Sequence, residues 1–171
     1  MNNKEKGTTI LEVAIYIAVL AIIVAAVGSL LLWAIRSQTK ARVLKETTLY
    51  ASNAMDAMTR KIREAQSIYE PTTSLNQLSL ETAANPPIDE SSTYVDLFLC
   101  DTRICLKREG ENPVPLTSEE LEVQTLEFRE VTTTFIPSVE ITLEAQYKNP
   151  SAKPELTASA RIVSTVSFRA Y

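Results

Sequence analysis

Few side chains in this sequence have the chemistry of a catalytic or binding site. Glu12 stands at the start of a long uncharged apolar run, residues 13–35. The chain has two cysteines, Cys100 and Cys105, and no histidine. Without histidine there is no Ser-His-Asp triad, no imidazole general base and no histidine ligand for zinc. Glu12 and the cysteine pair are therefore the candidate functional residues, and we expect no metal site.

The two cysteines are separated by four residues in "CDTRIC". This is not the CxxC spacing of a redox motif, and two cysteines without histidine make a poor metal site. A hairpin over this segment sets Cys100 opposite Cys105 and Leu99 opposite Leu106, at a spacing that suits a disulfide. We expect that disulfide, and two free thiols in a reducing host are the alternative.

The composition argues against several further classes of function. The chain has 171 residues, a formal net charge of -4 and three glycines. An acidic chain lacks the basic surface of nucleic-acid binding proteins, and three scattered glycines cannot form a GxxxxGK or GxGxxG phosphate loop. No nucleophile and base pair stands out from the spacing of serine, threonine, lysine or aspartate. We therefore expect a protein that is not an enzyme, with no cofactor and no direct nucleic-acid partner.

The apolar run is long enough to span a membrane. As a helix, its 23 residues extend roughly 35 Å, against about 30 Å for the hydrocarbon core of a bilayer. A cleaved signal peptide has a shorter apolar stretch, of about 7 to 15 residues. Glu12 either marks the polar edge of this helix or has a partner, because an acid in the bilayer costs roughly 2.5 to 3.5 kcal/mol or more.

The helix is predicted to continue well beyond the apolar run. Residues 29–70 contain no proline or glycine, and Pro71 then provides a stop. We expect one helix over residues 8–69. One face carries residues at alternating steps of four and three, which predicts a stripe covered by the rest of the chain: Leu44, Thr48, Ala51, Met55, Met58, Ile62, Ala65 and Tyr69.

Alternating apolar and polar residues predict strands in the remainder of the chain. "SVEITLEAQY" buries Val139, Ile141, Leu143, Ala145 and Tyr147 on one face, and a turn-rich segment joins it to a second such strand over residues 156–168. Further strands are predicted over residues 75–80, 94–100, 104–108 and 121–128. "TSEE", residues 117–120, fits a capping box before one helical turn. A helix followed by antiparallel strands indicates an α+β fold.

The amino-terminal residues resemble the leader of type IV prepilins. Lys4, Lys6, Gly7, a short hydroxyl and aliphatic stretch, Glu12 and the apolar run match that pattern, although Thr8 stands where this family usually has phenylalanine. The resemblance implies that a membrane peptidase cleaves between Gly7 and Thr8 on the cytoplasmic side and N-methylates Thr8. Glu12 then becomes the fifth mature residue, and its carboxylate pairs with the terminal ammonium of a neighbouring subunit during assembly.

Three later stretches are similar to J-type pseudopilins and W-type minor pilins: "MTRKIREAQSI", "VPLTSEELEVQTLEF" and "STVSFR". The resemblance implies a pilin-like α+β fold, with one long amino-terminal helix packed on a carboxy-terminal antiparallel sheet. It divides the chain into a leader (1–7), a transmembrane and assembly half of the helix (8–35), an amphipathic half (36–70) and an extracytoplasmic β-sheet domain (71–171).

The same resemblance implies a function as a minor pilin or pseudopilin. Such a subunit is a single-pass protein of the cytoplasmic membrane that enters a type IV pilus or type II secretion pseudopilus, at the tip or at the start of assembly. Its partners are other major and minor pilins, the prepilin peptidase, the inner-membrane assembly platform and the lipid bilayer. The alternative is a single-pass membrane-anchored extracytoplasmic binding domain that does not enter a filament.

Overall fold

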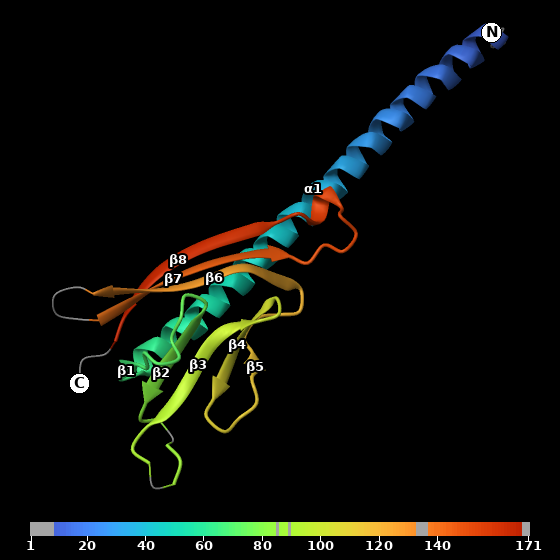
Figure 1. Ribbon diagram of the computed structural model, residues 1–171. Coiled ribbons are helices and arrows are strands. Elements are labelled where there is room, and N and C mark those ends of the chain that lie inside the picture. Colours follow the sequence, from blue (N-terminus) through green and yellow to red (C-terminus); the bar gives the residue numbers. More distant parts are fainter. Residues whose placement is uncertain (1–8, 85, 89, 133–136, 169–171) are drawn as a thin grey trace, which may run out of the picture. The chain divides into compact units, whose positions relative to one another are not determined.

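The computed structural model describes residues 9–84, 86–88, 90–132 and 137–168 (Figure 1). The chain divides into two compact units, residues 1–39 and 40–171. The elements, in chain order, are α1 (Ile10–Glu64), β1 (Ser67–Ile68), β2 (Gln77–Thr82), β3 (Thr93–Cys100), β4 (Arg103–Arg108), β5 (Val114–Pro115), β6 (Leu121–Thr132), β7 (Pro137–Tyr147), the 3-10 helix η1 (Pro154–Leu156) and β8 (Ser159–Ser167).

The second unit has the predicted α+β architecture, with a helix packed on antiparallel strands. The strands form two sheets, in the orders β1-β2-β3-β4-β5 and β6-β7-β8, and every pairing is antiparallel. The division falls after β5, which is two residues long and ends at Pro115. The N–H of Leu116 still donates to the carbonyl oxygen of Ile104 at 2.7 Å, but the N–H of Ile104 donates to the hydroxyl of Thr117 instead of a backbone carbonyl, so the backbone ladder ends there. The second sheet therefore starts anew at Leu121.

The core lies between the carboxy-terminal half of α1 and the two sheets. Met58 and Ile62 from the helix are fully buried together with Leu97 and Ile104 of the first sheet and Ile141 of the second. In β7 the predicted alternation is confirmed from Val139 to Ala145, since Val139, Leu143 and Ala145 are buried as well, whereas Tyr147 is only half-buried. Leu156 lies in η1, so β8 begins three residues later than predicted.

The predicted stripe on α1 is correct from Ala51 to Ile62 and wrong at its amino-terminal end, and its last members, Ala65 and Tyr69, lie beyond the end of the helix. Ala51, Met55, Met58, Ile62 and Ala65 are buried. Leu44 is 50% exposed and Thr48 is also exposed, whereas the preceding residues Val43 and Thr47 are buried.

The buried Ala54 explains the shift of that stripe. Ala54 lies seven residues, or about two helical turns, after Thr47, so the two residues share the flank that the sheets cover. The hydroxyl of Thr47 would be costly to bury unpaired. It donates to the carbonyl oxygen of Val43 at 2.8 Å, so Thr47 is tolerated in the core.

The helix ends at Glu64, five residues earlier than predicted. The chain then enters the first sheet, where the N–H of Gln66 donates to the carbonyl oxygen of Glu81 at 2.8 Å. Hydrogen bonds from Ser92 and Ser67 hold the pKa of Glu81 below its usual value. Tyr69 therefore lies outside the helix, with its ring centroid 4.6 Å from that of Tyr94.

Two local predictions around β4 are wrong. In the β3–β4 hairpin Cys100 pairs with Arg103 and Leu99 with Ile104, so Cys100 is not opposite Cys105. A tight turn causes the shift, because Asp101 has a φ of 55°, a left-handed conformation that aspartate tolerates.

The predicted capping box at residues 117–120 is absent as well. The hydroxyl of Thr117 instead accepts from the N–H of Ile104 at 3.2 Å, across to β4. Residues 118–121 form a single turn, in which the N–H of Leu121 donates to the carbonyl oxygen of Ser118 at 3.2 Å. Thr117 therefore links the segment before β6 to the first sheet by a hydrogen bond.

Replacing Ile62 by alanine is expected to lower the free energy of unfolding by about 2 to 5 kcal/mol, because the change leaves a cavity between α1 and the sheets. Leu44→Ala on the same helix is the matched control, and it is expected to cost less than about 1 kcal/mol because Leu44 is half exposed. Urea unfolding of the full chain in mild detergent, followed by circular dichroism, measures both. Equal losses would contradict the observed face of the helix.

Candidate functional site

Glu12 lies in the first turn of α1, and Gly7 and Thr8 lie outside the described residues. The N–H of Glu12 donates to the carbonyl oxygen of Thr9 at 3.0 Å and to the Thr9 hydroxyl at 3.3 Å. This is one half of a capping box, in which a threonine satisfies a free N–H at the helix start. An acid in the first turn is also favoured by the helix dipole. These local contacts indicate that Glu12 helps to stabilise the first turn of α1.

The carboxylate of Glu12 accepts a hydrogen bond from the hydroxyl of Tyr16, at 3.1 Å. Tyr16 is one turn further along α1, so both side chains lie on the same face. A carboxylate has about four acceptor positions, and this bond uses one. No ion pair to Glu12 is present among the described residues, which leaves its other acceptor positions open to a cation. The i,i+4 spacing of Glu12 and Tyr16, and the T-x-x-E pattern from Thr9, were the sequence signals for these contacts.

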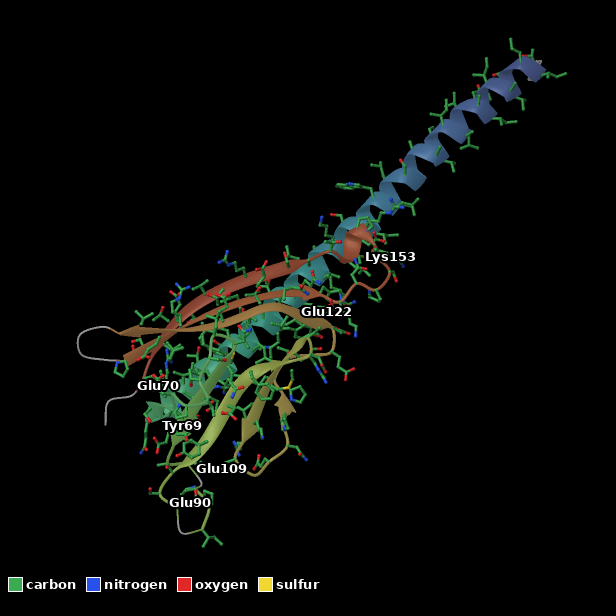
Figure 2. All side chains as sticks on the ribbon, in the orientation of Figure 1. Tyr69, Glu70, Glu90, Glu109, Glu122 and Lys153 are labelled. Atoms are coloured by element: carbon green, nitrogen blue, oxygen red, sulfur yellow. A yellow bond between two sulfur atoms is a disulfide. The ribbon has the colours of Figure 1, made fainter. Side chains whose placement is uncertain are left out.

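The apolar half of α1 is exposed in the part of the chain that the structure describes. Its large aliphatic side chains are between 44% and 92% exposed from Ile10 to Ile35, and Figure 2 shows side chains projecting around the whole helix. The most apolar window has a mean hydropathy of 2.8, and none of it is buried. Among the described residues, α1 is the one helix long and apolar enough to cross a membrane. The chain thus has the amino-terminal helix that single-pass anchoring requires.

The polar groups of this segment suit a bilayer. The hydroxyl of Ser29 donates to the carbonyl oxygen of Ala26 at 2.8 Å, and that of Thr39 to Ile35 at 3.0 Å. Hydroxyls bonded to their own helix carry no unpaired group into lipid. Tyr16 and Trp33, both more than 60% exposed, lie about 25 Å apart along the helix. Aromatic residues at such separations occupy the two interfaces of a membrane.

Charged groups follow where α1 joins the sheet domain. Arg42 and Glu46 form an ion pair at 2.8 Å, and this hydrogen bond raises the pKa of Arg42. Burial raises the pKa of Tyr147, and the neighbouring carboxylates of Glu120 and Glu46 add to the effect. Tyr147 is half-buried at this end of β7.

Cys100 and Cys105 form a disulfide in the structure. Their α-carbons are 5.8 Å apart, within the range of native bridges. The link is diagonal across the β3–β4 hairpin, because Cys105 pairs with Phe98 rather than with Cys100. Such a disulfide persists in an oxidising compartment.

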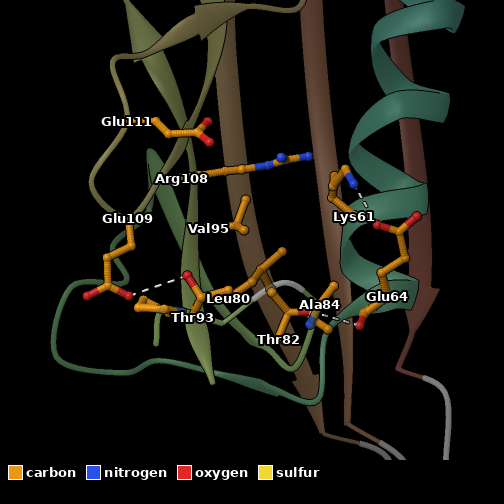
Figure 3. Close-up of a pocket in the computed structure, with 12 residues that line it drawn as sticks. Lys61, Glu64, Leu80, Thr82, Ala84, Thr93, Val95, Arg108, Glu109 and Glu111 are labelled. Atoms are coloured by element: carbon orange, nitrogen blue, oxygen red, sulfur yellow. Dashed lines mark hydrogen bonds and ion pairs between the residues drawn. The ribbon is translucent and has the colours of Figure 1, made fainter. Parts of the chain in front are cut away.

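A pocket of about 420 Å³ opens between the end of α1 and strands β2 to β4 (Figure 3). Lys61 is paired with Glu64 at 2.6 Å. The hydroxyl of Thr93 donates to the carboxylate of Glu109 at 3.4 Å, and that of Thr82 donates to the carbonyl oxygen of Glu64 at 3.3 Å. The hydroxyls of Thr93 and Thr82 in the pocket are thus held by acceptors within the protein.

The described part of the chain also brings no three histidine, cysteine, aspartate or glutamate side chains together as a metal site. The absence of enzymatic activity stays a prediction. The candidate functional residues remain Glu12, with Tyr16 as its contact, and the disulfide pair.

Comparison of this chain with protein-family models, with curated proteins and with solved structures finds no match. The resemblance to prepilin leaders therefore depends on the residues of this sequence alone.

Replacing both Ile22 and Ile23 by arginine is expected to release the protein from membranes. Each arginine at the centre of a spanning helix costs roughly 2.5 to 3.5 kcal/mol. The same double replacement at Ser37 and Gln38, beyond the apolar run, is the control and is expected to change nothing. Alkaline carbonate extraction of membranes, with immunodetection of pellet and supernatant, measures the outcome. A wild-type chain found in the supernatant would contradict the anchor.

Proposed function

We propose that this protein is a minor pilin or pseudopilin, a structural subunit of a type IV pilus or a type II secretion pseudopilus. The observation that carries the proposal is an apolar helix with one carboxylate at its start, which continues as the helix packed on an antiparallel sheet domain. The subunit acts at the tip of the filament or at the start of its assembly. Its role is structural and needs no cofactor.

The uncovered half of α1 supports a filament role. A helix that is apolar on all sides needs lipid or other apolar helices around it. A stored subunit meets lipid in the cytoplasmic membrane, and an assembled subunit meets the helices of its neighbours. The same 13–35 surface serves both states, so transfer from membrane to filament exchanges one apolar environment for another.

Glu12 supports the proposal through its open acceptor positions. Cleavage between Gly7 and Thr8 creates an ammonium group, and Glu12 of a neighbouring subunit supplies the opposite charge. In lipid, a carboxylate and an ammonium neutralise each other by a charge-assisted hydrogen bond. This pairing selects the axial position of an incoming subunit, because any other position leaves both charges unpaired.

The disulfide supports an extracytoplasmic sheet domain, since such bonds persist outside the reducing cytosol. Partners on that side are other major and minor pilins. On the membrane side they are the prepilin peptidase, the assembly platform and the bilayer.

A second function is favoured by one observation. Thr9 and Tyr16 already give Glu12 local contacts, so a carboxylate at this position also suits an ordinary helix start. On that basis the chain is a single-pass membrane-anchored binding domain that never enters a filament. The two functions differ in amino-terminal processing and in what a neutral residue at position 12 does.

Mass spectrometry of the protein from its native membrane tests the processing. We expect a chain that begins at Thr8 and carries one additional methyl group, because the leader peptidase both cleaves and methylates. Gly7→Ala, which adds a methyl side chain at the cleavage site, is expected to leave the leader attached. A native chain that begins at Met1 or Asn2 beside an active prepilin peptidase would overturn the filament proposal and favour the anchored domain.

Replacing Glu12 by glutamine is expected to reduce incorporation into sheared filaments by roughly tenfold or more, because a charge-assisted bond contributes about 1.5 to 3 kcal/mol. Glutamine keeps the size and an acceptor oxygen but removes the charge. Tyr16→Phe is the matched control, since it removes the local hydrogen bond and keeps the carboxylate. Loss of incorporation with Tyr16→Phe but not with Glu12→Gln would assign Glu12 to local helix structure.

A further inference from the structure

The two sheets have four edge strands, and three of these are closed to further pairing. β1 and β5 are two residues long, and β5 ends at Pro115. Along β6, the N–H of Val123 donates to the carbonyl oxygen of Thr102 and the N–H of Phe128 to that of Leu75, both at 2.8 Å. Short strands, proline and covering loops are the usual means by which proteins protect a sheet edge.

Among the described residues, nothing gives the fourth edge strand, β8, any of these protections. Ser159–Ser167 contains no proline or glycine, and its register with β7 is unbroken from Ser167 opposite Ser138 to Ser159 opposite Gln146. Figure 1 shows β8 as the outermost strand of its sheet. An open edge of this length presents a row of backbone donors and acceptors to another strand.

The register identifies the backbone groups that face outward. The N–H of Tyr147 donates to the carbonyl oxygen of Ala158 at 2.9 Å, and the N–H of Phe168 to that of Pro137 at 3.4 Å. In an antiparallel ladder, alternate residues direct both backbone groups to the same neighbour. The even-numbered residues of β8 therefore bond β7, and the odd-numbered residues direct their N–H and C=O groups to the open edge: Ser159, Arg161, Val163, Thr165 and Ser167.

The side chains of β8 show what kind of strand fits this edge. Ala160 and Ile162 lie on the core face, pack against the core and remain half-buried. An adjacent strand with apolar residues on that face would complete their burial. On the solvent face Arg161 lies opposite Glu144 of β7. An acidic side chain on the same face of an incoming strand would complement Arg161 from its other side.

We propose that the outer edge of β8 binds an extended segment of another protein, which alternates apolar and acidic or polar residues and pairs through backbone hydrogen bonds. The odd-numbered residues of β8 supply the donors and acceptors, and Ile162 and Arg161 select the two faces of the incoming strand. This is recognition by β-strand addition.

A second copy of this chain does not fit the edge equally well. Two identical edges pair antiparallel about a two-fold axis normal to the sheet. Within residues 40–171, the packed part of α1 runs in the same general direction as β8 (Figure 1). The α1 helices of two copies related by this axis would therefore run in opposite directions. Lys40 of one copy would lie at the opposite end of the dimer from Lys40 of the other. Two chains anchored in one membrane cannot adopt this arrangement. This conclusion rests on the membrane anchorage of the proposed function.

The test uses the full chain in lipid nanodiscs and a fluorescent synthetic peptide, SVEITLEAQY, which copies residues 138–147. This peptide already pairs with β8 as part of β7, alternates apolar and polar residues and contains Glu140 and Glu144. A scrambled peptide of the same composition is the negative control. Fluorescence anisotropy gives the dissociation constant, and amide hydrogen exchange reports the N–H groups of Arg161, Val163 and Thr165.

Val163→Pro removes one outward N–H without removing a bond to β7, and it is expected to weaken peptide binding by at least about tenfold. Val163→Thr keeps the N–H and the branched shape, and it is expected to bind like the wild type. In the wild-type chain, the peptide is expected to slow exchange at the three outward amides. This exchange measurement needs no variant, so it stands even where Val163→Pro unfolds the sheet.

Failure of the wild-type chain to bind the peptide above the scrambled control would overturn the proposal. Equal binding by Val163→Pro would do the same, because it would indicate replacement of β7 rather than addition at the edge. Concentration-dependent dimers that Val163→Pro abolishes would assign the edge to a second copy instead. None of these results depends on leader cleavage, so the edge and the filament role succeed or fail separately.

Discussion

The burial of one stripe of α1 against two sheets is the interaction on which the sheet domain depends. Met58 and Ile62 are fully buried, and both sheets contribute residues to the same cluster. Strands of this length would be marginal as isolated hairpins, so they need a helix or a further sheet as cover. The helix therefore joins two sheets that share few direct backbone bonds into one hydrophobic core.

Before residue 40 the same helix is exposed instead of buried. Its side chains from residue 13 to residue 35 are apolar on every side of the helix and exposed in the described part of the chain. A surface of this kind is stable only in lipid or among other apolar helices. The functions proposed for this protein thus depend less on a pocket than on exposed surfaces: an apolar helix with Glu12 at its start, and the open backbone edge of β8.

The local contacts of Glu12 are compatible with the intermolecular pairing that we propose for it. Its N–H completes the helix cap with Thr9, and its carboxylate accepts from Tyr16. Neither contact uses all the acceptor positions of the carboxylate. The local contacts orient the side chain, and an oriented carboxylate binds a cation with less loss of side-chain entropy than a free one.

Local sequence determined the features that depend on neighbouring residues: the apolar span of α1, the alternating burial of β7, the α+β order and Glu12 in the first helical turn. Hydropathy and periodicity are properties of short segments, so they are readable without a fold. The contact of Glu12 with Tyr16 was not predicted, although its i,i+4 spacing was a signal for it.

Only the tertiary structure decided where the helix ends, which flank of α1 is buried near Thr47, how Cys100 and Cys105 are bridged and which sheet edge stays open. Each of these depends on contacts between segments distant in sequence. Gln66 leaves the helix because Glu81 offers its carbonyl oxygen, and Thr117 leaves its predicted cap because Ile104 needs an acceptor. Backbone groups bond whichever partner the packed core brings near, and short sequence patterns do not contain that partner.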